Sequence, residues 1–294
     1  MTGAIWAMLS GVGFGFFQAF NRKARQGFSV YWATFILLVV SVLIMGTASV
    51  MMEDLTLLRL APPSAFINLG LAGFIHFFLG WTLLTISQNR VGAARTGALV
   101  GVTPLFATVI AIIAFDEFLT LPVLAGVVIV VGGVYFVSVS GANSGSPSRF
   151  NWRDSIYGLS VALCFSISPI FIRAGQEELP SPLLAVTVGM GVSAIAYGVL
   201  LLFRRERLNL ESVPNGLLLY QLMAGVMVGI STWMRWIALD LAPVAVVLAL
   251  GRLNVPVVIL LSLVLVGQKQ ERVTVRVWLG AGLIVLGSLM LIFF

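Results

Sequence analysis

Ten long apolar stretches constrain the fold of this chain more than any other feature of its sequence. Each is about 20 residues long, which is the length that an α-helix needs to cross the hydrocarbon core of a bilayer. Continuous apolar runs also exclude the alternating pattern of transmembrane β-strands. We therefore expect an all-α integral membrane protein with spans at residues 3–21, 29–51, 64–87, 91–114, 120–140, 155–174, 182–203, 215–238, 243–266 and 273–294.

The composition supports a membrane protein and argues against a nucleic-acid-binding protein. Of the 294 residues, 60% are hydrophobic and 10% are charged, whereas about a quarter of the residues in a soluble domain are charged. The net charge is +6, but the basic residues lie in short loops, where anionic lipid head groups are the expected partner. The single cysteine, Cys164, excludes a disulfide within the chain, and no residue cluster indicates a metal or a cofactor.

The distribution of positive charge predicts the orientation of the chain in the cytoplasmic (inner) membrane. Loops with many Lys and Arg residues stay in the cytoplasm. Most of the 17 basic residues follow odd-numbered spans, so both termini are expected on the non-cytoplasmic side. These residues are Arg22, Lys23, Arg25, Arg90, Arg95, Arg149, Arg153, Arg204, Arg205, Arg207, Lys269, Arg272 and Arg276.

Loop charge reverses between the two halves of the chain. The first half is basic after its first span, at Arg22 and Lys23, where the second half has Glu177 and Glu178. After the second span of each half the charges are opposite again, because the first half is acidic there and the second half is basic. Five spans per half is an odd number, so a repeated second half must enter the membrane upside down. Inverted repeats with a site between them are typical of secondary transporters.

Weak sequence similarity between the halves supports a repeat. We expect one five-helix unit at residues 1–141 and an inverted one at 152–294, joined by a stretch rich in Gly and Ser. Prolines in the fourth span of each half are expected to break those helices. The residues that align at a shift of 152 include Trp81 with Trp233, Ala93 with Ala245, and Pro104 with Pro256.

These features together resemble the drug/metabolite transporter superfamily, in its EamA-type ten-helix branch. Besides the spans and prolines, each half has a glutamate shortly after the proline, Glu117 and Glu271, and a glycine-rich last span. The resemblance implies a two-repeat transporter, usually an exporter of small metabolites, with a central cavity between spans 1, 3, 4, 6, 8 and 9. This chain departs from strict repetition, because Glu271 follows its proline two residues later than Glu117 does.

Arg252 is the leading candidate for substrate binding, because it lies near the middle of the ninth span. A charge at this depth costs at least about 2.5–3.5 kcal/mol on insertion scales. A guanidinium can bind both oxygens of a carboxylate or a phosphate. The alternative is that Arg252 only satisfies backbone carbonyls loosened by Pro256. Asn254 points away from Arg252 on a regular helix, so it either lines the cavity or holds helices together.

Three further candidates lie in the third and eighth spans. His76, the only histidine, could bind substrate or titrate in a proton-coupled cycle, or could be a packed structural residue. Trp81 and Trp233 occupy equivalent repeat positions, so they could line the two ends of the site. The alternative for this pair is an interfacial aromatic belt.

The first and sixth spans offer aromatic walls with one polar side chain, through Phe14, Phe165 and Gln18; the alternative is simple packing. No Asp or Glu lies in the middle of a span, which disfavours a proton/cation antiporter, since small multidrug relatives of the superfamily use a carboxylate in the first helix. A basic, aromatic cavity favours a substrate with a carboxylate and an apolar body.

We therefore expect a secondary transporter that exports amino acids, aromatic or hydrophobic ones favoured, or similar metabolites by alternating access. The alternative is a broad-range exporter of lipophilic or cationic compounds. An enzyme is not expected, because the sequence offers no catalytic set. The glycine-rich fifth and tenth spans could pack within a monomer or form the seam of a homodimer.

Overall fold

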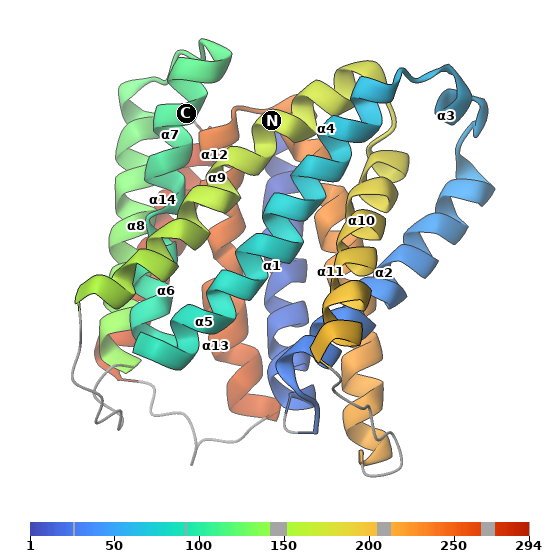
Figure 1. The fold of residues 1–294 in the computed structure, drawn as a ribbon. Coiled ribbons are helices and arrows are strands. Elements are labelled where there is room, and N and C mark those ends of the chain that lie inside the picture. The colour runs from blue at the N-terminus through green and yellow to red at the C-terminus, as the bar shows by residue number, and fades with distance from the viewer. Residues whose placement is uncertain (26, 92, 142–151, 205–212, 266–273, 294) are drawn as a thin grey trace.

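The computed structural model of the chain is a bundle of long helices in which both termini lie at the same end (Figure 1). It describes residues 1–25, 27–91, 93–141, 152–204, 213–265 and 274–293. Within these residues every regular element is helical. Ten helical segments are long and apolar enough to cross a membrane, which confirms the predicted fold class.

The first half contains five spans, of which the third and fourth are each built from more than one helix. A short peripheral helix, α3, lies between the second and third spans. The elements are α1 (Thr2–Ala24), α2 (Val30–Met52), α3 (Thr56–Leu60), α4 (Pro63–Gly73), the π-helical turn η1 (Phe74–Gly80), α5 (Trp81–Val91), α6 (Ala93–Gly101), α7 (Thr103–Phe115) and α8 (Leu121–Gly141).

The second half also contains five spans, and its fourth is interrupted as well. The helix α11 continues to Leu241, three residues beyond the predicted end of the eighth span, and stops only before Pro243. The elements are η2 (Trp152–Asp154), α9 (Ser155–Glu178), α10 (Pro182–Arg204), α11 (Asn215–Leu241), α12 (Val244–Leu250), the 3₁₀ turn η4 (Gly251–Leu253), α13 (Asn254–Leu265) and α14 (Val275–Phe293).

Helices in equivalent positions of the two halves pack against each other in opposite directions. The last helices, α8 and α14, meet through glycines: Gly126 faces Gly287, and Gly133 faces Gly280. A Cβ on Gly133 would lie 2.6 Å from the Gly280 carbonyl oxygen, so only glycine allows this approach. The sequence order on the two helices is reversed, as an inverted repeat requires. These glycine faces are thus used within the chain.

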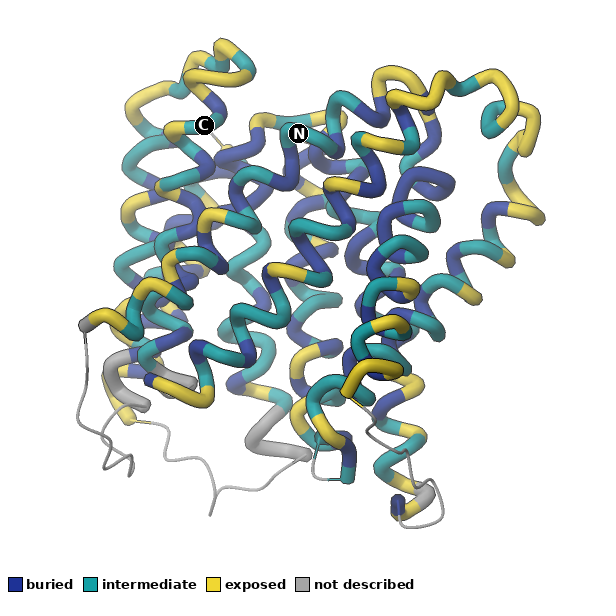
Figure 2. Tube along the Cα trace, in the orientation of Figure 1, coloured by how far each residue is buried: buried dark blue, intermediate teal, exposed yellow. Residues whose placement is uncertain are grey.

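The spans that contain α1, α4, α9 and α11 form the middle of the bundle (Figure 1). In the first half α1 packs along α11, and in the second half α9 packs along α4, η1 and α5, which is the equivalent pairing. Buried residues gather along these central helices, whereas exposed residues lie mainly on the outside and at the ends (Figure 2). Apolar side chains such as Leu43, Ile195 and Val285 are exposed there, as expected for surfaces that contact lipid.

Close packing of α1 brings aromatic side chains next to the interrupted ninth span. A Cβ on Gly11 would lie 2.8 Å from the Leu250 carbonyl oxygen, and one on Gly15 would lie 2.5 Å from Val257 Cβ. Small residues let transmembrane helices approach this closely. The side chain of Phe14, which lies between these glycines, is thereby held inside the bundle.

Candidate substrate-binding site

His76 lies at the centre of a hydrogen-bonded chain that joins three spans. Its Nδ1 is 2.9 Å from Ser168 Oγ on α9, and its Nε2 is 3.0 Å from a terminal guanidinium nitrogen of Arg235 on α11. A guanidinium only donates hydrogen bonds, so Nε2 accepts and the ring proton lies on Nδ1. His76 is therefore neutral in this arrangement. It belongs to η1, and π-helical turns are frequent at functional sites.

Aromatic rings cover both members of the His76–Arg235 pair. Phe165 stacks on the imidazole, with 4.4 Å between ring centroids and 24° between planes. Phe14 lies under the guanidinium of Arg235, whose central carbon is 5.0 Å from the ring centroid. A Cβ on Gly80 would lie 2.6 Å from the Phe165 ring, so this glycine makes room for the stack. Two of the predicted aromatic residues thus contact the cluster.

Arg252 belongs to η4, the 3₁₀ turn that interrupts the ninth span. One of its terminal nitrogens donates to the Val100 carbonyl, 3.0 Å away, at the break between α6 and α7 in the fourth span. Arg252 therefore satisfies a loosened carbonyl, but one from the opposite repeat rather than from its own helix. It also lies within electrostatic range of His76 and of Arg235.

Arg235 and Arg252 each have a hydrogen-bond donor without a partner. The Nε atoms of Arg235 and Arg252 are buried and have no hydrogen-bond partner. In the part of the chain that the structure describes, neither arginine is in an ion pair. Yet both residues are only half-buried, although they lie well inside their spans. Unpaired buried donors in a native site require an explanation, and a bound anion is one.

The two predicted tryptophans lie inside the bundle, on either side of this cluster. Trp81 stacks on Phe17 at a centroid distance of 5.8 Å, and Trp233 meets Trp6 edge to face at 6.0 Å. Phe17 and Trp6 are 11 residues apart on α1, which is about 16 Å along a helix. Both tryptophans pack against the hydrophobic core rather than standing free in an outer belt.

The two predicted polar residues lie outside the hydrogen-bonded cluster. Gln18 is one turn beyond Phe14 on the same face of α1, and its side chain is exposed. Asn254 is buried at the start of α13, near Gly15, and its Oδ1 has no hydrogen-bond partner. Neither side chain contacts Arg235 or His76 in the described hydrogen bonds.

Sequence analysis missed Arg235 and Ser168 as site residues. Arg235 lies within the predicted eighth span, residues 215–238, but only three residues from its end, where an arginine is not unusual. The true end of α11 at Leu241 places Arg235 almost two turns inside the helix. The helix-ending sequence Asp240–Leu241–Ala242–Pro243 is the signal that could have shown this. Ser168 carried no comparable signal, since its role depends entirely on its partner.

A second arginine cluster lies at the end of the bundle that holds the termini, and we call it the terminal clasp. Arg173 on α9 forms an ion pair of 2.6 Å with Glu117. Its other nitrogens donate to the carbonyls of Leu239 and Ala242, at 2.8 and 2.7 Å. Glu117 also accepts from the backbone N–H of Val244. The clasp therefore ties together the fourth, sixth, eighth and ninth spans at this end.

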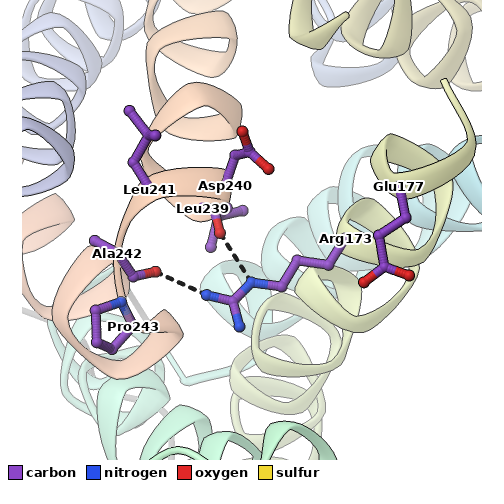
Figure 3. Close-up of a pocket in the computed structure, with 7 residues that line it drawn as sticks. All are labelled: Arg173, Glu177, Leu239, Asp240, Leu241, Ala242 and Pro243. Carbon is purple, nitrogen blue, oxygen red and sulfur yellow. Dashed lines mark hydrogen bonds between the residues drawn. The ribbon is translucent and has the colours of Figure 1, made fainter. Parts of the chain in front are cut away.

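A pocket of about 420 Å³ opens beside the terminal clasp. Figure 3 shows the Arg173 guanidinium turned toward the backbone that links α11 to α12, with its donors directed at carbonyl oxygens. Since these donors are occupied, the clasp holds the helices together at this end rather than offering a free cation. The pocket is lined by Arg173, Glu177, Leu239, Asp240, Leu241, Ala242 and Pro243. The repeat partner of Glu117, Glu271, lies outside the described residues.

The EamA-like transporter family matches in two segments, residues 1–139 and 153–293. No curated protein matches the chain. A solved structure described only as "Crystal structure of protein" is similar over 96% of this chain and 95% of its own, with a TM-score of 0.73. Its sequence is 16% identical, so this similarity concerns the fold alone.

Proposed function

The chain belongs to the EamA-like transporter family, and from this premise we propose that it exports small metabolites that carry a carboxylate. The aromatic or hydrophobic amino acids expected from the sequence are members of this class. The observation that carries the proposal is the pair Arg235 and Arg252, whose Nε donors are buried without partners. A carboxylate satisfies such donors, because its two oxygens match the planar fork of a guanidinium.

The surroundings of the two arginines suit the rest of such a substrate. Phe14 and Phe165 present aromatic faces next to the charged groups. Trp81 and Trp233 contact α1 through Phe17 and Trp6, which lie on opposite sides of Phe14 along the helix. The apolar body of the substrate would extend toward these rings. His76 positions Arg235 through the 3.0 Å hydrogen bond. Gln18 and Asn254 remain predicted contacts, at the margin of this site.

Alternating access is the mechanism that an inverted repeat favours. In the conformation described here the terminal clasp joins four spans at one end, whereas Gln18 is exposed toward the other end. If basic loops face the cytoplasm, the closed end is the non-cytoplasmic one. We infer that this conformation loads substrate from the cytoplasm and that breaking the clasp between Arg173 and Glu117 accompanies release.

A broad-range exporter of lipophilic compounds is the second candidate, and the aromatic side chains around α1 favour it. Phe17, Trp81 and Phe14 form a continuous set of ring contacts. Cationic compounds fit less well, because two guanidinium groups repel them and no described carboxylate contacts either arginine. In this second reading Arg252 has a structural role only.

Counterflow in proteoliposomes tests the proposal. We expect labelled phenylalanine or a related aromatic carboxylate to accumulate with wild-type protein, and accumulation to be lost in Arg252→Lys, which keeps the charge but not the fork. Arg59→Lys, at an exposed position on α3, is the matched control. A folded wild-type protein that moves no carboxylate at all, but does move neutral lipophilic compounds, would favour the second candidate.

A further inference from the structure

We propose that the substrate is an organic anion with a net negative charge, and that zwitterionic amino acids are secondary ligands. This inference rests on the proposed function and narrows its substrate class. Arg235 and Arg252 each carry a permanent positive charge, and His76 is neutral because its Nε2 accepts from Arg235. The described side chains around them therefore leave two positive charges uncompensated.

The acidic residues of the chain are placed where they cannot balance these charges. All 11 Asp and Glu residues lie in loops or at the ends of spans in the sequence. The described ones have other partners in several cases: Glu117 pairs with Arg173, and Asp154 pairs with Arg90. A zwitterion has no net charge, so it would leave the excess in place. An anion reduces this excess positive charge, and the electrostatic energy gained is large in surroundings of low polarity.

An ammonium group near the carboxylate would also find few acceptors. The Val100 carbonyl already accepts from Arg252 and from Thr103 Oγ1. His76 Nε2 accepts from Arg235, and Ser168 Oγ is the partner of His76 Nδ1. The acceptors that contact the arginines are thus in use. An ammonium held close to a bound carboxylate would face two guanidinium groups without compensation.

One acceptor without a partner would instead favour a zwitterion. Asn254 Oδ1 is buried and has no hydrogen-bond partner, so it could accept from an ammonium. It is an uncharged amide, however, and does not offset the positive charge. The variant Asn254→Ala tests whether this oxygen binds an ammonium group.

Three ligands of nearly equal size separate the possibilities. 3-Phenyllactate is an anion, phenylalanine is a zwitterion because it has an ammonium in place of the hydroxyl, and phenylalaninamide is a cation without a carboxylate. Affinity for purified wild-type protein is measured by titration calorimetry in detergent, which avoids leakage of weak acids across vesicles. We expect 3-phenyllactate to bind at least 10-fold more tightly than phenylalanine, and phenylalaninamide not to bind.

Variants identify the residues responsible for the preference. Arg235→Gln and Arg252→Gln should each reduce the ratio of the two affinities toward unity, whereas Arg235→Lys should weaken binding but keep the preference for the anion. Arg59→Gln is the control for a lost surface charge. Size-exclusion profiles and melting curves show that each variant is folded. A ratio unchanged in both folded Gln variants would overturn the assignment.

The outcomes distinguish this inference from the proposed function. Phenylalanine binding as tightly as 3-phenyllactate, with loss in Asn254→Ala, would overturn the inference and leave a carboxylate exporter with an ammonium site. Binding of phenylalaninamide but of neither carboxylate would overturn both.

Discussion

Arg173 and Arg235 lie on helices of the same half, and both reach across to other spans, but they differ in how far their donors are used. Arg173 has Glu117, two carbonyls and the ring of Phe115 as partners. Arg235 has only His76 and the face of Phe14, and its Nε has no partner. A cation whose donors are saturated holds a structure together, whereas one with donors left over is available for a ligand.

The largest effect expected from this comparison is the loss of transport in Arg235→Leu. Removing one partner of a buried charged contact costs about 2–5 kcal/mol in binding, so counterflow should fall by at least about 30-fold. Stability should fall less than in Arg173→Leu, because Arg235 is in no described ion pair and the change leaves only His76 Nε2 without its donor. Transport and melting temperature are measured on the same preparation. A large drop in melting temperature with transport retained would reverse the roles of the two arginines.

Arg173→Leu should have the opposite profile, with stability as the main loss. The change leaves Glu117 without its ion-pair partner and the Leu239 and Ala242 carbonyls without donors. We expect a loss of about 2–4 kcal/mol in the free energy of unfolding, since breaking a largely buried pair leaves an uncompensated charge. Thermal unfolding in detergent measures it. Binding of 3-phenyllactate to the folded fraction should be close to that of the wild type.

Double substitution at the clasp separates the charge from the hydrogen bonds. Glu117→Gln keeps an oxygen for the N–H of Val244 but removes the negative charge. It should destabilise less than Arg173→Leu, and combining it with Arg173→Leu should cost less than the sum of the two. Additive effects would show that the 2.6 Å pair is not coupled.

A smaller effect is expected for His76→Gln. The amide retains one acceptor, so Arg235 stays partly positioned, but the stack on Phe165 is lost. We expect the apparent affinity for the transported carboxylate to weaken by about 5–10-fold, which is about 1–1.4 kcal/mol, with little change in maximal flux. Concentration-dependent counterflow separates the two quantities. A loss of flux alone would place His76 in the conformational cycle rather than in binding.

The smallest transport effect belongs to the glycine contact between α8 and α14, far from either arginine. Gly133→Ala meets backbone atoms of α14 and should destabilise by about 1–3 kcal/mol, with substrate preference unchanged. Gly132→Ala is the matched control, since nothing lies within 4 Å of its Cβ position. Melting curves of the two variants, measured in parallel, test whether this seam holds the halves together. Equal melting temperatures would show that it does not.

Much of the architecture could be predicted from the sequence because membrane insertion depends on local hydropathy. The ten spans and the reversed charge of the two halves follow from residues counted along the chain. Arg252 and His76 could be singled out in the same way, the first as a charge within a span and the second as the only histidine. Arg235 could not be singled out, because it lies only three residues from the predicted end of its span, whereas α11 continues to Leu241.

Tertiary structure alone decided which of these residues meet. His76 reaches Ser168 and Arg235 across sequence separations of 92 and 159 residues, and Arg173 reaches Glu117 in the same way. In a soluble protein an apolar stripe marks the inner face of a helix. In a membrane, lipid and protein interior are both apolar, so the pattern of hydrophobic residues cannot show which face turns inward. The sequence determined the number and depth of the spans, and packing determined which side chains share a site.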